Sequence, residues 1–183
     1  MADGLFYNDL REPFVGTDVA AVTLAATAKA LYPAGAFPVL GGQYFARVGK
    51  KLRVRLFGRI TTGLTPGNGS FNVYYGTGAD AAGIVLMTGT PVALLPSQTN
   101  LSWATEIFIH CRSTGSAGTL FCTGRALFNS AVQAGPILLP ASAPVVSAAC
   151  DLTAANIISV QYLRSGSTAE TMQVHDIEVV AMN

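Results

Sequence analysis

The sequence predicts an all-β protein: an antiparallel, jelly-roll-like sandwich of about eight strands with an irregular N-terminal arm. Short segments repeatedly alternate apolar and polar residues at the two-residue period of a strand. Gly, Pro and Ser separate these segments, and almost no stretch shows helical periodicity. The strand number and the irregular loop lengths favour a jelly roll over an immunoglobulin-like sandwich, whose Cys–Trp–Cys arrangement is absent from this sequence.

Residues 1–42 carry little periodic pattern, so we expect an arm over 1–42 and the sandwich domain over 43–183. The arm contains apolar residues such as Phe6, Tyr7 and Phe14, which disfavour disorder. We therefore expect the arm to lie on its own domain or on a neighbouring subunit. Its alanine-rich part from Ala20 to Leu31 offers a short helix, although β-branched residues and the following Pro33 weaken that prediction.

The first predicted strand, 47–62, anchors the core and carries six of the eleven basic residues of the chain. Its even positions give an apolar face: Val48, Leu52, Val54, Leu56 and Ile60. Its odd positions give a cationic face interrupted by Phe57: Arg47, Lys51, Arg53, Arg55 and Arg59. Successive side chains of a strand point to opposite faces, so one face is buried and the other carries charge.

The other predicted strands follow between turn signals, at 71–75, 84–87, 92–95, 101–112, 119–128, 156–164 and 171–182. The strands 101–112 and 119–128 form the clearest hairpin, joined by the Gly- and Ser-rich loop 113–118. The proline-bearing segment 135–149 is expected to be an extended loop with one short strand.

The composition favours self-association. Half of the residues are apolar and only 11% are charged, below the usual quarter for globular domains. Apolar surface that remains exposed tends to be covered by partner chains, so we expect a homo-oligomer, most simply a homotrimer. We see no secretory signal and no apolar stretch of membrane-spanning length, so we expect a soluble protein made inside the cell, with no membrane partner.

The sequence nominates no catalytic centre, no metal site and no cofactor. His110 and its neighbour Cys111 would point to opposite faces of one strand and cannot share a metal. Asp176 and Glu178 share a face that His175 avoids, and they are better explained as a solvated edge or as partners of arginines than as a cation site or an acid/base pair. No phosphate-binding loop or nucleophile elbow occurs. We expect no enzyme, and we expect Cys111, Cys122 and Cys150 to be free, buried thiols.

The cationic face of 47–62 admits three interpretations: an acidic protein partner or the acidic arm, a solvated face paired with an acid such as Glu106, or nucleic acid. Nucleic acid is the weakest, since only Phe57 could stack a base on this face. The first interpretation, which we favour, names eight candidate partner-binding residues: Phe6, Tyr7, Phe14, Arg47, Lys51, Arg53, Arg55 and Arg59.

Three stretches together resemble the small jelly-roll-like structural proteins encoded among the virion genes of tailed bacteriophages. They are LYPAGAFPVLGGQYFARVGKKLRVRLFGRI, ILLPASAP and ISVQYLRSGSTAETMQVHDIEVVAMN. The resemblance implies a virion component, a head decoration (cement) protein that binds the major capsid protein or another virion protein, often as a trimer. It carries no catalytic motif and therefore no residue roles.

Two alternatives remain open. A receptor- or carbohydrate-binding module of a tail fibre or tail tip should present surface aromatics, for which Tyr74, Trp103 and Phe108 are candidates. A jelly-roll coat subunit should carry a more basic arm, whereas residues 1–18 are net acidic.

Overall fold

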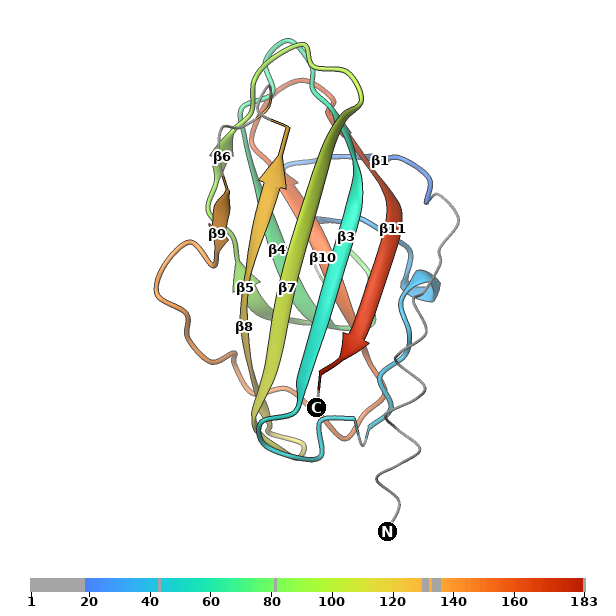
Figure 1. Ribbon diagram of the computed structural model, residues 1–183, viewed down its shortest axis with the longest axis vertical. Helices are drawn as coiled ribbons and strands as arrows, with labels where there is room; N and C mark the ends of the chain where they lie inside the picture. The colour runs from blue at the N-terminus through green and yellow to red at the C-terminus, as the bar shows by residue number, and fades with distance from the viewer. Residues whose placement is uncertain (1–18, 43, 81, 130–131, 133–135, 183) are drawn as a thin grey trace.

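The chain folds into a sandwich of two antiparallel β-sheets (Figure 1). The computed structural model describes residues 19–42, 44–80, 82–129, 132 and 136–182. This part of the chain holds eleven strands and one short 3-10 helix, η1, at Ala34–Ala36. The predicted all-β sandwich is therefore confirmed.

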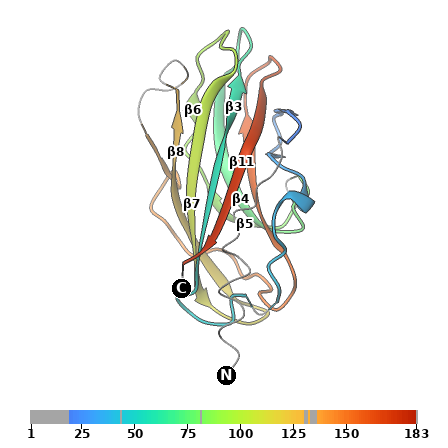
Figure 2. The ribbon, with the colours of Figure 1, turned by 45° about the vertical axis from the view of Figure 1, so that its right-hand side comes forward.

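The first sheet has six strands in the order β1-β11-β3-β7-β8-β9, and its long strands lie side by side in Figures 1 and 2. Its strands are β1 (Val22–Thr23), β3 (Lys51–Thr61), β7 (Leu101–Ser113), β8 (Thr119–Phe128), β9 (Ile137–Leu139) and β11 (Thr171–Ala181). The predicted hairpin of β7 and β8 and the short strand after it are both present.

The second sheet has the order β2-β10-β4-β5, with β6 also paired to β4. Its strands are β2 (Lys29–Ala30), β4 (Asn68–Gly76), β5 (Ile84–Thr88), β6 (Val92–Ala93) and β10 (Ile157–Arg164). The winding is jelly-roll-like. The chain passes from β3 in the first sheet to β4 in the second, and near its end it returns from β10 in the second sheet to β11 in the first. β3 pairs with β11, and β4 pairs with β10.

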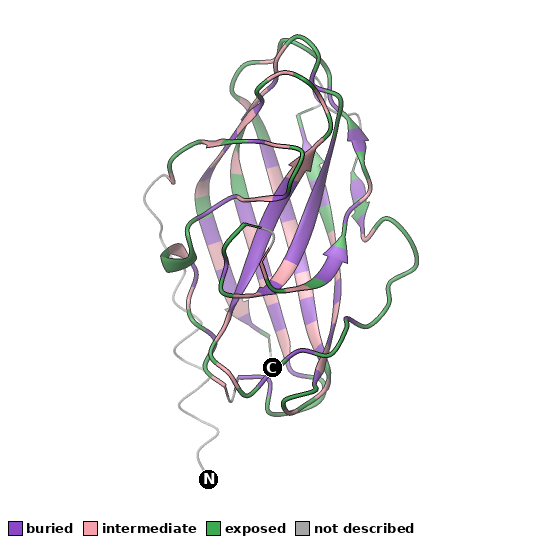
Figure 3. Ribbon diagram, turned by 180° about the vertical axis from the view of Figure 1, so that it is seen from behind, coloured by how far each residue is buried: buried purple, intermediate pink, exposed green. Residues whose placement is uncertain are grey.

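Buried side chains from both sheets meet in one core. Along the long strands of the six-stranded sheet, buried residues alternate with more exposed ones, as the colour bands of Figure 3 show, whereas β4 and β10 are buried along most of their length. Phe71 is central: its ring centroid lies 5.4 Å from that of Trp103, 5.7 Å from that of Phe128 and 4.8 Å from that of Tyr162. These aromatic contacts join the two sheets, since Phe71 and Tyr162 come from one sheet and Trp103 and Phe128 from the other.

The described part of the expected arm belongs to the sandwich itself. Residues 22–23 pair with β11 and residues 29–30 pair with β10, so this segment extends both sheets. It also buries side chains in the common core: Leu24, Leu31, Tyr32, Phe37 and Leu40. The short helix expected between Ala20 and Leu31 is wrong, because sheet pairing outweighs the helix propensity of the alanines.

The side chain of Tyr32 forms hydrogen bonds with backbone groups at the edge of β10. Its hydroxyl donates a hydrogen bond to the Ile158 carbonyl at 2.7 Å and accepts one from the Val160 backbone N–H at 3.0 Å. Burial raises the pKa of this hydroxyl far above its usual value, so it stays protonated and can donate. Tyr32 thus takes the place of a neighbouring strand at this edge.

We predict that Tyr32→Phe lowers the free energy of unfolding by about 1–3 kcal/mol, because it leaves a buried donor and a buried acceptor of β10 unpaired. Urea unfolding followed by circular dichroism measures the change. Tyr74→Phe is the matched control, since this partly exposed tyrosine is expected to contribute little. An unchanged midpoint for Tyr32→Phe would contradict the structural role of its hydroxyl.

Cys111, Cys122 and Cys150 are free and buried. The register of the hairpin places Cys111 opposite Leu120, and Cys122 opposite Ile109. Cys111 and Cys122 are therefore not cross-strand partners. Burial raises the pKa of the Cys122 thiol far above its usual value, which makes its thiolate scarce at neutral pH.

The predicted first strand is correct in its faces but begins too early. β3 starts at Lys51, and Arg47 and Val48 lie in the turn before it. Val48, predicted to be buried, is 60% exposed, whereas the other four predicted apolar positions have no exposed surface. The glycine at position 49 has a φ of +85°, which breaks the extended conformation just before the strand.

Candidate partner-binding face

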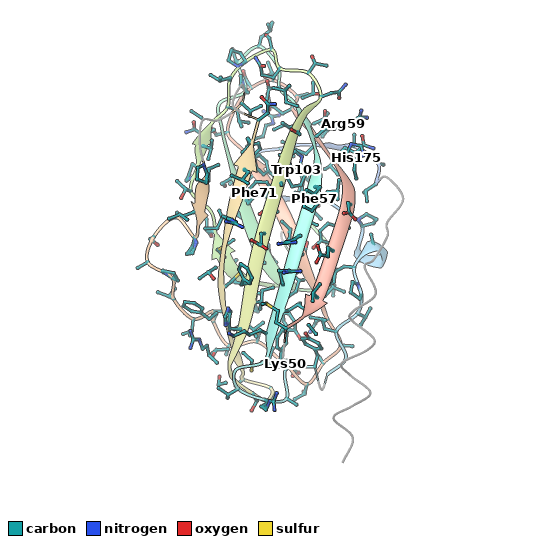
Figure 4. All side chains as sticks on the ribbon, viewed as in Figure 1. Lys50, Phe57, Arg59, Phe71, Trp103 and His175 are labelled. Carbon is teal, nitrogen blue, oxygen red and sulfur yellow. The ribbon has the colours of Figure 1, made fainter. Side chains whose placement is uncertain are left out.

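The outer face of the six-stranded sheet, which points away from the second sheet, is the candidate site. We define the outer face by the side chains of β3, β7, β8 and β11 that alternate with buried ones. In the described part of the chain, no segment crosses in front of β3 and β7 (Figure 1). Figure 4 shows Phe57 near the middle of β3 and Arg59 nearer one end of the strand. The predicted cationic face of β3 is thus the centre of an open sheet surface.

A row of alternating charges crosses the outer face, one residue from each of four neighbouring strands. The sheet register aligns Glu178 of β11 with Arg55 of β3, Arg55 with Glu106 of β7, and Glu106 with Arg125 of β8. We call these four residues the charge ladder. Directly opposed cross-strand pairs have side chains in contact range, so opposite charges in this register stabilise the sheet.

The ladder residues form ion pairs with one another. Arg55 Nε lies 2.7 Å from Glu106 Oε1, and Arg125 Nη2 lies 2.9 Å from Glu106 Oε2. Arg55 Nη1 also approaches Glu178 at 3.5 Å, while Arg53 Nη2 lies 2.6 Å from Glu178 Oε1. Glu178 and Glu106 are thus partners of arginines, which for Glu178 is one of the two interpretations that the sequence left open.

Glu106 is the most buried member of the ladder, with a side chain that is 12% exposed. The hydrogen bond from the Arg55 guanidinium, with the positive charges of Arg55 and Arg125, holds the pKa of Glu106 below its usual range. The carboxylate therefore stays ionised in the folded protein at pH values where it begins to protonate in the unfolded chain.

This shift predicts a pH dependence. Because the folded-state pKa of Glu106 is lowered, its contribution to stability is present above the usual glutamate pKa and is lost as the pH falls through the folded-state value. We expect native protein to be more stable than Glu106→Gln at neutral pH, with the difference shrinking at acidic pH. Urea midpoints of both proteins between neutral and acidic pH measure this. A difference that does not change with pH would contradict an electrostatic origin.

Beside the ladder, the next row of residues forms an apolar hollow. Phe57 lies opposite Ala104, and Ala104 lies opposite Leu127. The small Ala104 side chain leaves a hollow of about 230 Å³, lined also by ladder residues Arg55, Glu106 and Arg125. Phe57 is 43% exposed and Leu127 is 45% exposed, so an aromatic and an aliphatic side chain flank the hollow in solvent.

The structure gathers four of the eight predicted partner-binding residues on the outer face. Lys51, Arg53, Arg55 and Arg59 all belong to β3, and Arg59 donates a hydrogen bond to Gln173 of β11 at 2.8 Å. Arg47 is exposed in the preceding turn and does not belong to this strand. Phe6, Tyr7 and Phe14 lie outside the described residues.

Sequence reasoning missed Arg125, Ala104 and Leu127 as members of this face. Their own strands show the two-residue alternation that places them opposite to buried neighbours, and this signal was available. It does not reveal that the three residues meet β3, because the order of strands in the sheet is not encoded locally.

A bulge changes the prediction for the last strand. The register of β11 shifts between Val174 and Asp176, so His175 is an extra residue there. His175 is half-buried and Asp176 is exposed, so His175 does not lie on the buried face. Among the described residues, no group of three or more His, Cys, Asp or Glu side chains is placed to hold a metal ion.

The described residues also contain no helix of the length and apolar character needed to cross a membrane.

No protein-family model and no curated protein matches the chain. Among solved structures, it is similar to a legume lectin-like domain from Entamoeba histolytica, with 6% identity and a TM-score of 0.31 over 73% of each chain. It is also similar to an engineered GH43 glycoside hydrolase with endo-xylanase and exo-arabinofuranosidase activity, with 11% identity and a TM-score of 0.33. That match covers 71% of this chain and 29% of the other. Likenesses this distant carry no argument about function.

Proposed function

We propose that the chain is a non-enzymatic structural protein of a tailed-bacteriophage virion. In this role it is a decoration (cement) protein that binds the head surface as a homo-oligomer and stabilises it. The virion assignment rests on the resemblance of the three sequence stretches. The observation that supports a binding role is the open outer face, where exposed Phe57 and Leu127 flank a hollow beside the charge ladder. Exposed apolar groups rimmed by polar ones are typical of protein–protein contact surfaces.

The chemistry of the face favours a protein partner. In the described residues it carries six cations against three acids: Lys51, Arg53, Arg55, Arg59, Arg112 and Arg125 against Glu106, Asp176 and Glu178. Glu106 and Glu178 are engaged with arginines of the same face. A protein surface with exposed apolar groups and charges of both signs fits this composition.

The tail-fibre alternative loses one of its three aromatic candidates. Trp103 is 3% exposed and packs in the core, so it cannot stack on a sugar. Tyr74 belongs to β4 of the second sheet and Phe108 to β7 of the first. The two side chains lie on opposite outer faces of the sandwich and cannot form one platform.

The composition of the virion tests this proposal. Quantitative mass spectrometry of purified virions encoded by the same genome should find the chain in many copies per particle. Adding purified protein to particles that lack it should raise the temperature at which they release DNA, while particles that already carry it serve as the control. Absence from the virion, or only a few copies per particle, would overturn the decoration role.

A further inference from the structure

We propose that the outer face pairs with the same face of a second copy of the chain. The two copies would be related by a two-fold axis parallel to the strands and passing between β3 and β7. The inference rests on the proposed function, because it names the partner of the face that this function uses. The proposed two-fold pairing gives a dimer in place of the trimer expected from the sequence.

The charge ladder is complementary to itself under this symmetry. From β11 to β8 it reads acid, base, acid, base: Glu178, Arg55, Glu106 and Arg125. A two-fold axis parallel to the strands reverses this order in the facing copy. Glu178 then faces Arg125 of the second copy, and Arg55 faces its Glu106. An axis perpendicular to the strands, in the plane of the interface, would instead set like charges against each other, which disfavours that arrangement.

The inner pair of the neighbouring row fits the same axis, whereas its outer members, Asp176 and Leu127, would face each other across the axis without a favourable match. Phe57 and Ala104 lie on the two strands that flank the axis. The Phe57 ring therefore faces Ala104 of the second copy, at the hollow of about 230 Å³, and the partner ring enters the hollow of the first copy. Close packing of a large side chain over a small one is typical of protein interfaces, and an aromatic anchor in a pocket often dominates their binding energy.

The row on the other side of the charge ladder is also compatible with the proposed two-fold axis. Arg53 lies opposite Phe108 in the sheet, so the two-fold axis places Arg53 over Phe108 of the second copy. A guanidinium over an aromatic ring is attractive. Facing sheets pack with their strands nearly aligned, so these matches are closest near the axis and weaken toward the strand ends. Lys51 and Arg59 lie near those ends.

The first experiment measures the oligomeric state of the isolated, full-length protein. We expect size-exclusion chromatography with light scattering to show a dimer at micromolar concentration. Ala104→Arg fills the hollow with a charged side chain and should weaken dimerisation by about tenfold or more. Val39→Arg introduces the same residue at an exposed position outside the outer face and should leave the dimer intact.

The second experiment identifies which residues face each other. Arg125→Glu sets two acids against each other in a homodimer, and Glu178→Arg sets two bases against each other, so each variant alone should dimerise weakly. When the two variants are mixed, an acid faces a base at both contacts between position 178 of one copy and position 125 of the other. Mixing should therefore restore the dimer. Effects within one subunit are the same before and after mixing, so recovery reports the contact between subunits. Circular dichroism checks that both variants fold.

Three outcomes would overturn the proposed dimer. These are a monomeric native protein, no recovery on mixing, or a dimer that Ala104→Arg leaves unchanged. A face that binds an acidic protein or residues 1–18 of its own chain would give no recovery on mixing. Failure of the dimer is separate from failure of the decoration role, because virion composition is measured without reference to the state of the isolated protein.

Discussion

Replacing Glu170 by Gln is expected to lower the free energy of unfolding by about 3–5 kcal/mol, because it breaks a buried ion pair. Glu170 has no exposed surface, and its Oε2 lies 3.0 Å from Nε of Arg164, whose side chain is 15% exposed. The same guanidinium donates hydrogen bonds to the carbonyls of Leu24 and Gly166. The substitution leaves this cation without its counter-charge where the β10–β11 turn meets the segment after β1.

The exposed pair of Lys29 and Asp80 is the matched control. Its atoms approach to 2.6 Å, but the two side chains are 34% and 46% exposed. Exposed ion pairs contribute about 0–1 kcal/mol, so Asp80→Asn should change stability much less. Urea unfolding of both variants beside native protein measures the difference. Equal losses would show that burial is not what makes the Arg164–Glu170 pair important.

Replacing Gly58 by Ala is expected to destabilise the protein by about 3 kcal/mol or more, at the upper end of overpacking costs. A Cβ atom at this position would lie 2.0 Å from the Gln173 carbonyl oxygen and 2.8 Å from the Trp103 ring. The first neighbour is backbone of β11, so the paired strands would have to separate. The cost comes from space alone, because the backbone of Gly58 is not in the left-handed region.

Gly41→Ala provides the control for Gly58→Ala, since a Cβ atom there has no neighbour within 4 Å and the backbone is likewise not left-handed. Thermal unfolding should show a large drop in midpoint for Gly58→Ala and little change for Gly41→Ala. Trp103 fluorescence gives a second readout, because the added methyl group presses on that ring. Equal midpoints for the two variants would contradict the tight packing of β3 against β11.

Part of the candidate site could be predicted from one strand. The alternation in β3 predicted that Arg53, Arg55 and Arg59 share a face with Phe57, and the structure confirms it. Glu106 was one of the suggested partners, and it pairs with Arg55. The hollow could not be predicted, because it requires Ala104 and Leu127 to lie beside Phe57 in adjacent strands. That proximity depends on strand order and register, which are set by pairings between distant segments.

The segment before the first long strand shows the limit of local patterns. Residues 19–42 lack a sustained period and contain alanines that favour a helix. They nevertheless pair with β11 and β10 and bury Tyr32 against β10, because those strand edges offer unpaired backbone groups. No local signal marks which edges a short segment will complete.

The sequence by itself determined that the chain forms a β-sandwich and which side chains of β3 are buried. These features follow from the two-residue period of a strand and from turn residues, both of which are local. Only the tertiary structure decided that acids and arginines from four strands form one ladder, that Ala104 opens a hollow beside Phe57, and that Trp103 lies inside. Those outcomes depend on which strands become neighbours, which is settled by burying all the apolar faces together in one core.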